Sequence, residues 1–189
     1  MRLFLLPVAF LCAALTAAAA EPAAPLTPEA LAERLTDLGY EPKDVSAKKN
    51  KEVWQVVTER DNWKVYINVS LSTDRKYLWL ELKTAPLTGP DQAPADVWLR
   101  LLELSYAHFP AQFSYTKEDK RIHLWKPVLN HNLTPAKLRA EIDAFDAVAR
   151  KTVDAWNPKN FAAPAAPAPA VKTAAAVYTS PGAMKRSPI

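Results

Sequence analysis

Few residues in this sequence have the type and spacing that catalysis or metal binding requires. The three histidines are His108, His123 and His131, and no two of them are spaced like a helical or zinc-binding pair. Ser114 lies opposite His123 if the segments around them form a hairpin, which gives one pairing of a nucleophile with a base. A polar cross-strand pair is the simpler interpretation, because no orienting carboxylate or oxyanion hole is marked. We therefore predict no catalytic residue, no metal site and no cofactor.

The acidic residues and the glycines suggest no site either. Glu141, Asp143 and Asp146 are interpreted as the solvated face of a helix. The chain has only 3 glycines, and they form neither a phosphate-binding loop nor a dinucleotide fingerprint. The candidate site residues therefore indicate less about function than the segments that form helices and strands.

The N-terminal residues 1–20 have the pattern of a secretory signal peptide. Arg2 precedes an apolar run, and small residues end the segment at Ala20. The run is too short to span a bilayer in the mature protein, although an uncleaved anchor is an alternative. We expect cleavage before Glu21, export to the periplasm or beyond the cell, and no transmembrane span afterwards.

The C-terminal residues 159–189 are rich in alanine and proline and contain no acid. Such a composition buries too little apolar surface to offset its ordering entropy, so we predict a disordered or partly extended tail. The tail and Arg2 account for the net charge of +4, which leaves residues 21–158 close to neutral. A near-neutral domain argues against a nucleic-acid partner. The cationic tail is a solvated linker or a contact to an acidic envelope surface.

Residues 53–83 predict three antiparallel strands. Asp61-Asn62 suits a two-residue type I′ turn, which sets Arg60 opposite Trp63. A second turn at 73–76 gives the middle strand the same inward face, and this agreement supports the register. The inward face carries Trp54, Val56, Val65, Ile67, Val69, Leu71, Leu78, Leu80 and Leu82.

The opposite face of these strands is both polar and aromatic, and it carries Tyr66, Tyr77 and Trp79. The next segment, residues 95–107, is a helix with a narrow polar stripe, so we expect most of its circumference to be buried. We predict that this helix, with Trp98 and Leu101, covers the aromatic face in part and meets a second copy of the chain. The alternative is a helix buried at the centre of a monomer. The predicted packing seam or partner-binding site comprises Tyr66, Tyr77, Trp79, Trp98 and Leu101.

Two more strands and a long helix complete the domain. "QFSYT" and "RIHLW" form a hairpin, and "LTPAKLRAEIDAFDAVARKTVDAW" forms a helix capped by Thr134. With the first helix, which begins after Thr27 and stops at Gly39, the order is helix, three strands, helix, two strands, helix. The predicted class is α+β, with a largely antiparallel sheet packed by helices.

This order resembles the type III secretion chaperone-like fold, which includes sensory-transduction-regulator-type domains. The resemblance covers residues 26–158 and rests on "LGY", "ERDNWKVYINVSLS", "LLELSYAHFPAQFSY" and "LTPAKLRAEID". It implies a binding module, often dimeric, that holds partner polypeptides. The chain departs from the cytoplasmic chaperones in its signal peptide and its Pro/Ala-rich tail.

Two classes of function follow. The first is a non-catalytic, exported, homodimeric module that binds a protein or peptide in a chaperone-like or regulator-like role. The alternative is an envelope-associated small-ligand binder or hydrolase that uses the His123 side of the sheet. A concave pocket with converging polar groups at that side would favour the alternative.

Overall fold

The strands form one six-stranded antiparallel sheet in the order β1-β2-β3-β4-β6-β5. The computed structural model describes residues 24–47 and 51–161, so the predicted signal peptide and the tail beyond Phe161 lie outside the described residues. The helices are α1 (Pro28–Asp37), α2 (Ala95–Ala107), α3 (Pro135–Lys151) and α4 (Val153–Trp156), with short 3-10 turns η1 (Pro90–Gln92) and η2 (Pro158–Asn160). The strands are β1 (Lys43–Asp44), β2 (Val53–Arg60), β3 (Trp63–Leu71), β4 (Tyr77–Lys83), β5 (Gln112–Thr116) and β6 (Arg121–Leu129). The predicted α+β class and element order are confirmed, and β1 is an addition that the sequence did not reveal.

Both predicted turns set the register that the sequence indicates. Asp61 and Asn62 have φ values of 51° and 60°, as a type I′ turn requires. Arg60 pairs with Trp63, and the second hairpin pairs Leu71 with Leu78. The predicted inward face of the sheet is therefore correct.

Helices α1 and α3 begin with the same capping arrangement. The hydroxyls of Thr27 and Thr134 each accept a hydrogen bond from a backbone amide in the first turn, and a proline follows each cap. Gly39 ends the first helix region with a φ of 81°, a conformation that glycine adopts without strain. These local signals fix where the two helices start and where α1 stops.

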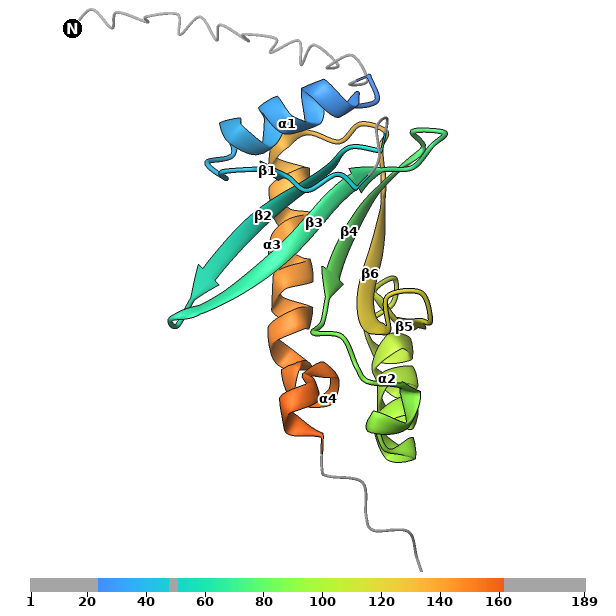
Figure 1. The fold of residues 1–189 in the computed structure, drawn as a ribbon. Helices are drawn as coiled ribbons and strands as arrows, with labels where there is room; N and C mark the ends of the chain where they lie inside the picture. The colour runs from blue at the N-terminus through green and yellow to red at the C-terminus, as the bar shows by residue number, and fades with distance from the viewer. Residues whose placement is uncertain (1–23, 48–50, 162–189) are drawn as a thin grey trace, which may run out of the picture.

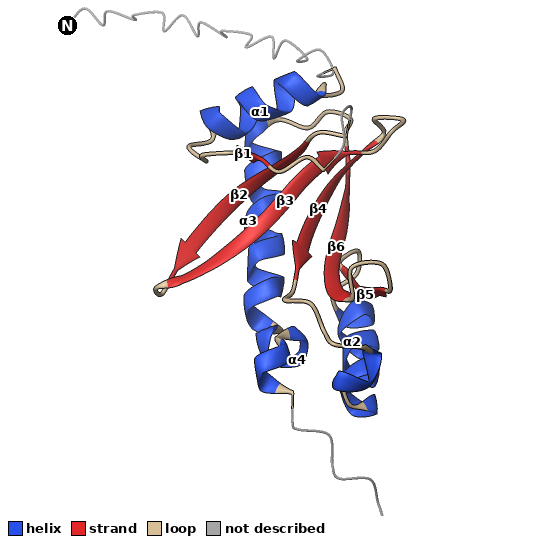
Figure 2. Ribbon diagram, viewed as in Figure 1, coloured by secondary structure: helices blue, strands red, loops and turns tan. Residues whose placement is uncertain are grey.

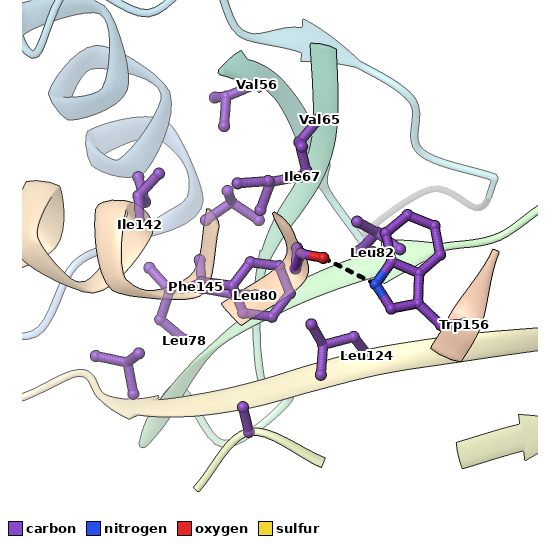
Figure 3. Packing of buried hydrophobic residues seen from close by; sticks show 14 of the residues in the cluster. Val56, Val65, Ile67, Leu78, Leu80, Leu82, Leu124, Ile142, Phe145 and Trp156 are labelled. Carbon is purple, nitrogen blue, oxygen red and sulfur yellow. Dashed lines mark hydrogen bonds between the residues drawn. The ribbon is translucent and has the colours of Figure 1, made fainter. Parts of the chain in front are cut away.

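Helix α3 runs along one face of the sheet, and α1 lies at one end of it (Figure 1, Figure 2). The core forms between α3 and the inward side chains of β2, β3, β4 and β6, as Figure 3 shows around Phe145, Ile67 and Leu80. All three are fully buried. We call the face of the sheet opposite α3 the outer face.

The predicted final helix is interrupted rather than continuous. Helix α3 ends at Lys151, and the hydroxyl of Thr152 donates to the carbonyl of Val148, 2.7 Å away. The chain then turns through α4, and the Trp156 indole donates to the carbonyl of Ala149 at 2.9 Å (Figure 3). After this turn Trp156 lies buried in the core. Phe161, assigned to the tail from sequence, also packs partly against this core.

Candidate binding surfaces

The predicted site residues lie in two separate places. Tyr66, Tyr77 and Trp79 lie on the outer face of the sheet, on β3 and β4. Trp98 and Leu101 lie on α2, which packs on β5 and α4 at the end of the molecule opposite α1 (Figure 1). The structure does not bring these two groups together.

The prediction that α2 covers the aromatic outer face is wrong for the single chain. Tyr66 is 52% exposed and Tyr77 is 39% exposed, and α2 docks against β5 instead. Two contacts hold it there: Trp98 meets Tyr115 edge to face at 5.6 Å, and the Phe113 amide donates to Ser105 Oγ at 2.9 Å. This Ser105 hydroxyl also bonds within the helix, to the Leu101 carbonyl.

Helix α2 is also less buried than its composition predicts. Leu101 is its one fully buried residue, and Trp98 is half-buried. Large apolar side chains project from the other side of the helix and the turn after it, and they are Leu99, Leu102, Tyr106 and Phe109. We call these four residues the α2 stripe. Tyr106 is 90% exposed, so the stripe is an apolar surface without a cover among the described residues.

The outer face carries a row of aromatic rings that crosses from β4 to β6. Tyr77 and Trp79 lie 6.4 Å apart between ring centroids, and Trp79 meets Trp125 edge to face at 6.1 Å. Trp125 in turn stacks on His123 at 5.2 Å with nearly parallel planes. We call Tyr77, Trp79 and Trp125 the aromatic row. Sequence reasoning missed Trp125, although it lies two residues after His123 in β6 and therefore shares its face.

A chain of polar side chains continues across the same face. Gln55 donates to Asn68 at 3.2 Å, and Asn68 donates to Glu81 at 3.3 Å. The other carboxylate oxygen of Glu81 lies 2.7 Å from His123 Nδ1, and His123 Nε2 lies 3.1 Å from the Asp119 carboxylate. Glu81 and His123 are almost fully buried, so their hydrogen bonds are shielded from solvent.

The two carboxylates determine the charge state of His123. Burial by itself lowers the pKa of His123, but its hydrogen bonds and charge interactions with Glu81 and Asp119 outweigh burial and raise the pKa above its ordinary value. Burial likewise raises the pKa of Asp119, and its hydrogen bonds with Thr116 and His123 outweigh that effect and lower it. The two carboxylates thus stabilise the charged form of the imidazole relative to its neutral form.

The same contacts separate His123 from Ser114. The two residues are paired across β5 and β6, as predicted, but both imidazole nitrogens are bonded elsewhere. The Ser114 hydroxyl accepts a hydrogen bond from the Trp125 indole at 2.7 Å. The geometry gives Ser114 no base, so His123 serves to position Trp125.

Asp146 corrects the prediction of a solvated acidic face on α3. Its side chain is fully buried and accepts from Thr58 Oγ1 at 2.5 Å and from Arg150 Nε at 2.9 Å. Arg60 approaches the same carboxylate at 3.4 Å, and Asp143 beside it is half-exposed and pairs with Arg60. Arg150 also donates to backbone carbonyls of the β2–β3 hairpin. The cluster fastens α3 to that hairpin and is structural.

Two grooves on the described surface lie near α1. One, of about 630 Å³, is lined by Leu31, Trp54 and Trp79, and the other, of about 470 Å³, by Leu26 and Tyr77 among others. His123 lines neither groove. In the part of the chain that the structure describes, no group of His, Cys, Asp and Glu has the arrangement of a metal site. None of the described helices is long and apolar enough to cross a membrane.

No protein-family model and no curated protein sequence matches this chain. Among solved structures, a chain in "Crystal Structure of the ExsC-ExsE Complex" is similar over 69% of this chain and 92% of that chain, with 17% identity and a TM-score of 0.47. A chain in "Structure of the HopA1-SchA Chaperone-Effector Complex" is similar over 64% and 88%, with 14% identity and a TM-score of 0.44. Both similarities concern the fold alone.

Proposed function

We propose that this protein is an exported, non-catalytic module that binds another polypeptide and acts as a homodimer joined through α2. The observation that supports the dimer is the α2 stripe. Leu99, Leu102 and Tyr106 follow one another at spacings of three and four residues, so they line one side of the helix. A surface of this kind is the same on both copies and can pair with itself about a two-fold axis.

The contacts of His123 support a binding role rather than hydrolysis. Its ring nitrogens are committed to Glu81 and Asp119, and the Ser114 hydroxyl is committed to Trp125. These contacts fix an aromatic surface in which Trp79 and Trp125 are half-buried and Tyr77 is exposed. Aromatic side chains of this kind contribute large contact area at low entropic cost in protein recognition.

The dimer is tested by Leu102→Asp and measured by sedimentation velocity over a range of concentrations. Leu102 is 65% exposed in the single chain, so the substitution should leave the melting temperature of the monomer unchanged. In a dimer it would desolvate an unpaired carboxylate, so the dissociation constant should rise at least tenfold. Arg100→Glu is the matched control, because it places a carboxylate on the polar side of the same helix. A wild-type protein that stays monomeric at high micromolar concentration removes the dimer from the proposal.

Export is tested by mass spectrometry of the protein recovered from the cell envelope and from the medium. The motivating pattern is Arg2, the apolar run and the small residues that end at Ala20. We expect a mature chain that begins at Glu21. A protein that still begins at Met1 and is recovered with the cytoplasmic fraction contradicts export and leaves the dimer proposal intact.

A further inference from the structure

The His123 ring joins strand β4 to the turn that closes the β5–β6 hairpin. On one side of the ring, Nδ1 lies 2.7 Å from the Glu81 carboxylate of β4. On the other side, Nε2 lies 2.7 Å from Thr116 Oγ1 and 3.1 Å from the Asp119 carboxylate in the turn. The Thr116 hydroxyl also donates to Asp119, so three polar groups meet at one corner of the hairpin.

The number of protons on the ring decides which of these hydrogen bonds form together. An imidazolium has two N–H groups and donates to Glu81 and Asp119 at the same time. A neutral imidazole has one N–H, so one of the two carboxylates then faces a bare nitrogen lone pair. The Glu81 side chain is 10% exposed and that of Asp119 is 35% exposed, so an unpaired Glu81 costs more. In the neutral ring the remaining proton therefore stays on Nδ1, and Nε2 is the bare nitrogen.

The Thr116 hydroxyl is the group that can respond to a bare Nε2. While the ring is charged, this hydroxyl donates to Asp119. Because a hydroxyl hydrogen rotates freely, the same group can donate to Nε2 instead once the ring is neutral. Asp119 then loses its bonds to Thr116 and His123 together, although these two bonds are what keep the pKa of its carboxyl low against burial. Its half-exposed carboxylate is left to turn toward water.

No other charged group takes over a bond to the ring among the described residues. The charged side chains on the face of His123 come from β4, the turn and β6 itself, and they are Glu81, Lys83, Asp119 and Arg121. The remaining charged residues of the turn are exposed, and they are Lys117, Glu118 and Lys120. Lys83 Nζ lies 3.5 Å from Glu81, and the Arg121 guanidinium donates to the Thr84 carbonyl. Strand β5 presents hydroxyl groups, which keep their protons throughout the range in which histidine titrates.

We propose that His123, Thr116 and Asp119 form a proton-operated latch, which holds the β5–β6 turn while the ring is charged and releases it when the ring loses a proton. The stack of His123 on Trp125 carries the change to the aromatic row, because a cationic ring is attracted to the indole face and a neutral ring loses that attraction. A rise in pH therefore loosens the turn and the end of the row next to it. The latch belongs to the hairpin and depends neither on the dimer nor on a bound partner.

The test is an NMR titration of the full chain, labelled with ¹³C and ¹⁵N, from pH 5 to pH 9, which brackets the ordinary histidine pKa of about 6.5. The ring nitrogens of His123 should titrate at a higher pH than those of the exposed His131. The backbone carbonyl signals of residues 117–120, which do not exchange with water, should move toward random-coil values with the midpoint of His123. The ring signals of Trp125 should shift with the same midpoint. Turn signals that do not follow this midpoint overturn the proposal.

Matched variants identify the groups of the latch. Asp119→Asn should lower the His123 midpoint and abolish its effect on the turn, whereas Glu118→Gln removes an exposed carboxylate from the same turn and should change neither. A turn that still titrates with His123 in Asp119→Asn overturns the proposal.

Thr116→Val keeps the branched side chain but removes the hydroxyl that is proposed to move. The neutral ring then has no donor for Nε2, so the His123 midpoint should rise above that of the wild type. A midpoint that stays the same or falls shows that the hydroxyl does not transfer to the neutral ring, and it overturns the latch.

Discussion

The buried Asp146 carboxylate offers the most quantitative test of the fold. Asp146→Ala would remove the acceptor of the Thr58 hydroxyl and the counter-charge of Arg150, whose side chain is only 15% exposed. Breaking a buried ion pair from one side typically costs about 3–5 kcal/mol, because the remaining charge stays desolvated. Arg150 keeps its backbone carbonyl acceptors, which places the expected loss toward about 3 kcal/mol.

Asp143→Ala is the matched control, one helical turn away. Asp143 also bonds Arg60, at 3.0 Å, but its side chain is 45% exposed, and exposed ion pairs contribute only about 0–1 kcal/mol. Urea denaturation followed by tryptophan fluorescence measures both variants. The difference of about 2–3 kcal/mol corresponds to a gap in melting temperature of roughly 5–15 °C for a domain of this size.

A double variant separates the buried charge from the packing around it. Asp146→Leu combined with Arg150→Met replaces both charged groups by apolar side chains of similar volume, and such replacements are often neutral. We expect it to recover much of the stability that Asp146→Ala loses. If Asp146→Ala falls within about 1 kcal/mol of Asp143→Ala, the buried pair is not what fastens α3 to the β2–β3 hairpin.

Two further predictions concern His123 and Trp156. The pKa of His123 is raised in the folded state, so its contribution to stability should be complete below the ordinary histidine pKa of about 6.5 and be lost as the pH rises through the raised value. Urea midpoints between pH 5 and pH 9 should therefore fall more steeply in the wild type than in His123→Gln, with the exposed His131→Gln as control, and equal slopes would contradict the charged state of His123. Trp156→Phe should cost about 1–3 kcal/mol by calorimetry, because it leaves the buried carbonyl of Ala149 without the indole donor, and no loss would mean that water replaces the bond.

The hairpins and helix starts could be predicted because their signals are local. Asp61-Asn62 specifies a turn, the alternation on either side specifies a face, and Thr-Pro marks where α1 and α3 begin. By contrast, β4 pairs with β6 rather than with β5, and no short-range pattern encodes a choice between distant partners. The aromatic outer face was predicted residue by residue, but its continuation into Trp125 required this pairing.

The location of α2 and the burial of Asp146 show where sequence periodicity fails. The pattern of an apolar helix predicts that it is buried, but it does not identify the surface on which the helix packs. In α2, the side bearing Leu101 faces the core near β5 rather than the outer face. Asp146 looked like one of several acids on a helix. The signal that could have identified it is Arg150, four residues later on the same side of α3. That spacing favours an ion pair without showing whether the pair is buried.

The pairing of β4 with β6 closes the segment between them, which carries α2 and β5, into a loop. Thr84 and Ile122, 38 residues apart, close its base through hydrogen bonds of 3.0 and 3.2 Å, and the Leu87 amide adds a third bond to the carbonyl of Lys120. The α2 stripe lies inside this closed loop, although α2 also packs on α4, and Ser114 inside the loop bonds Trp125 of the aromatic row. Lengthening a surface loop adds little to its closure entropy, so residues between the clamps can change without altering the register of β4 on β6. The exposed side of α2 can therefore vary in sequence while β4 and β6 keep their pairing.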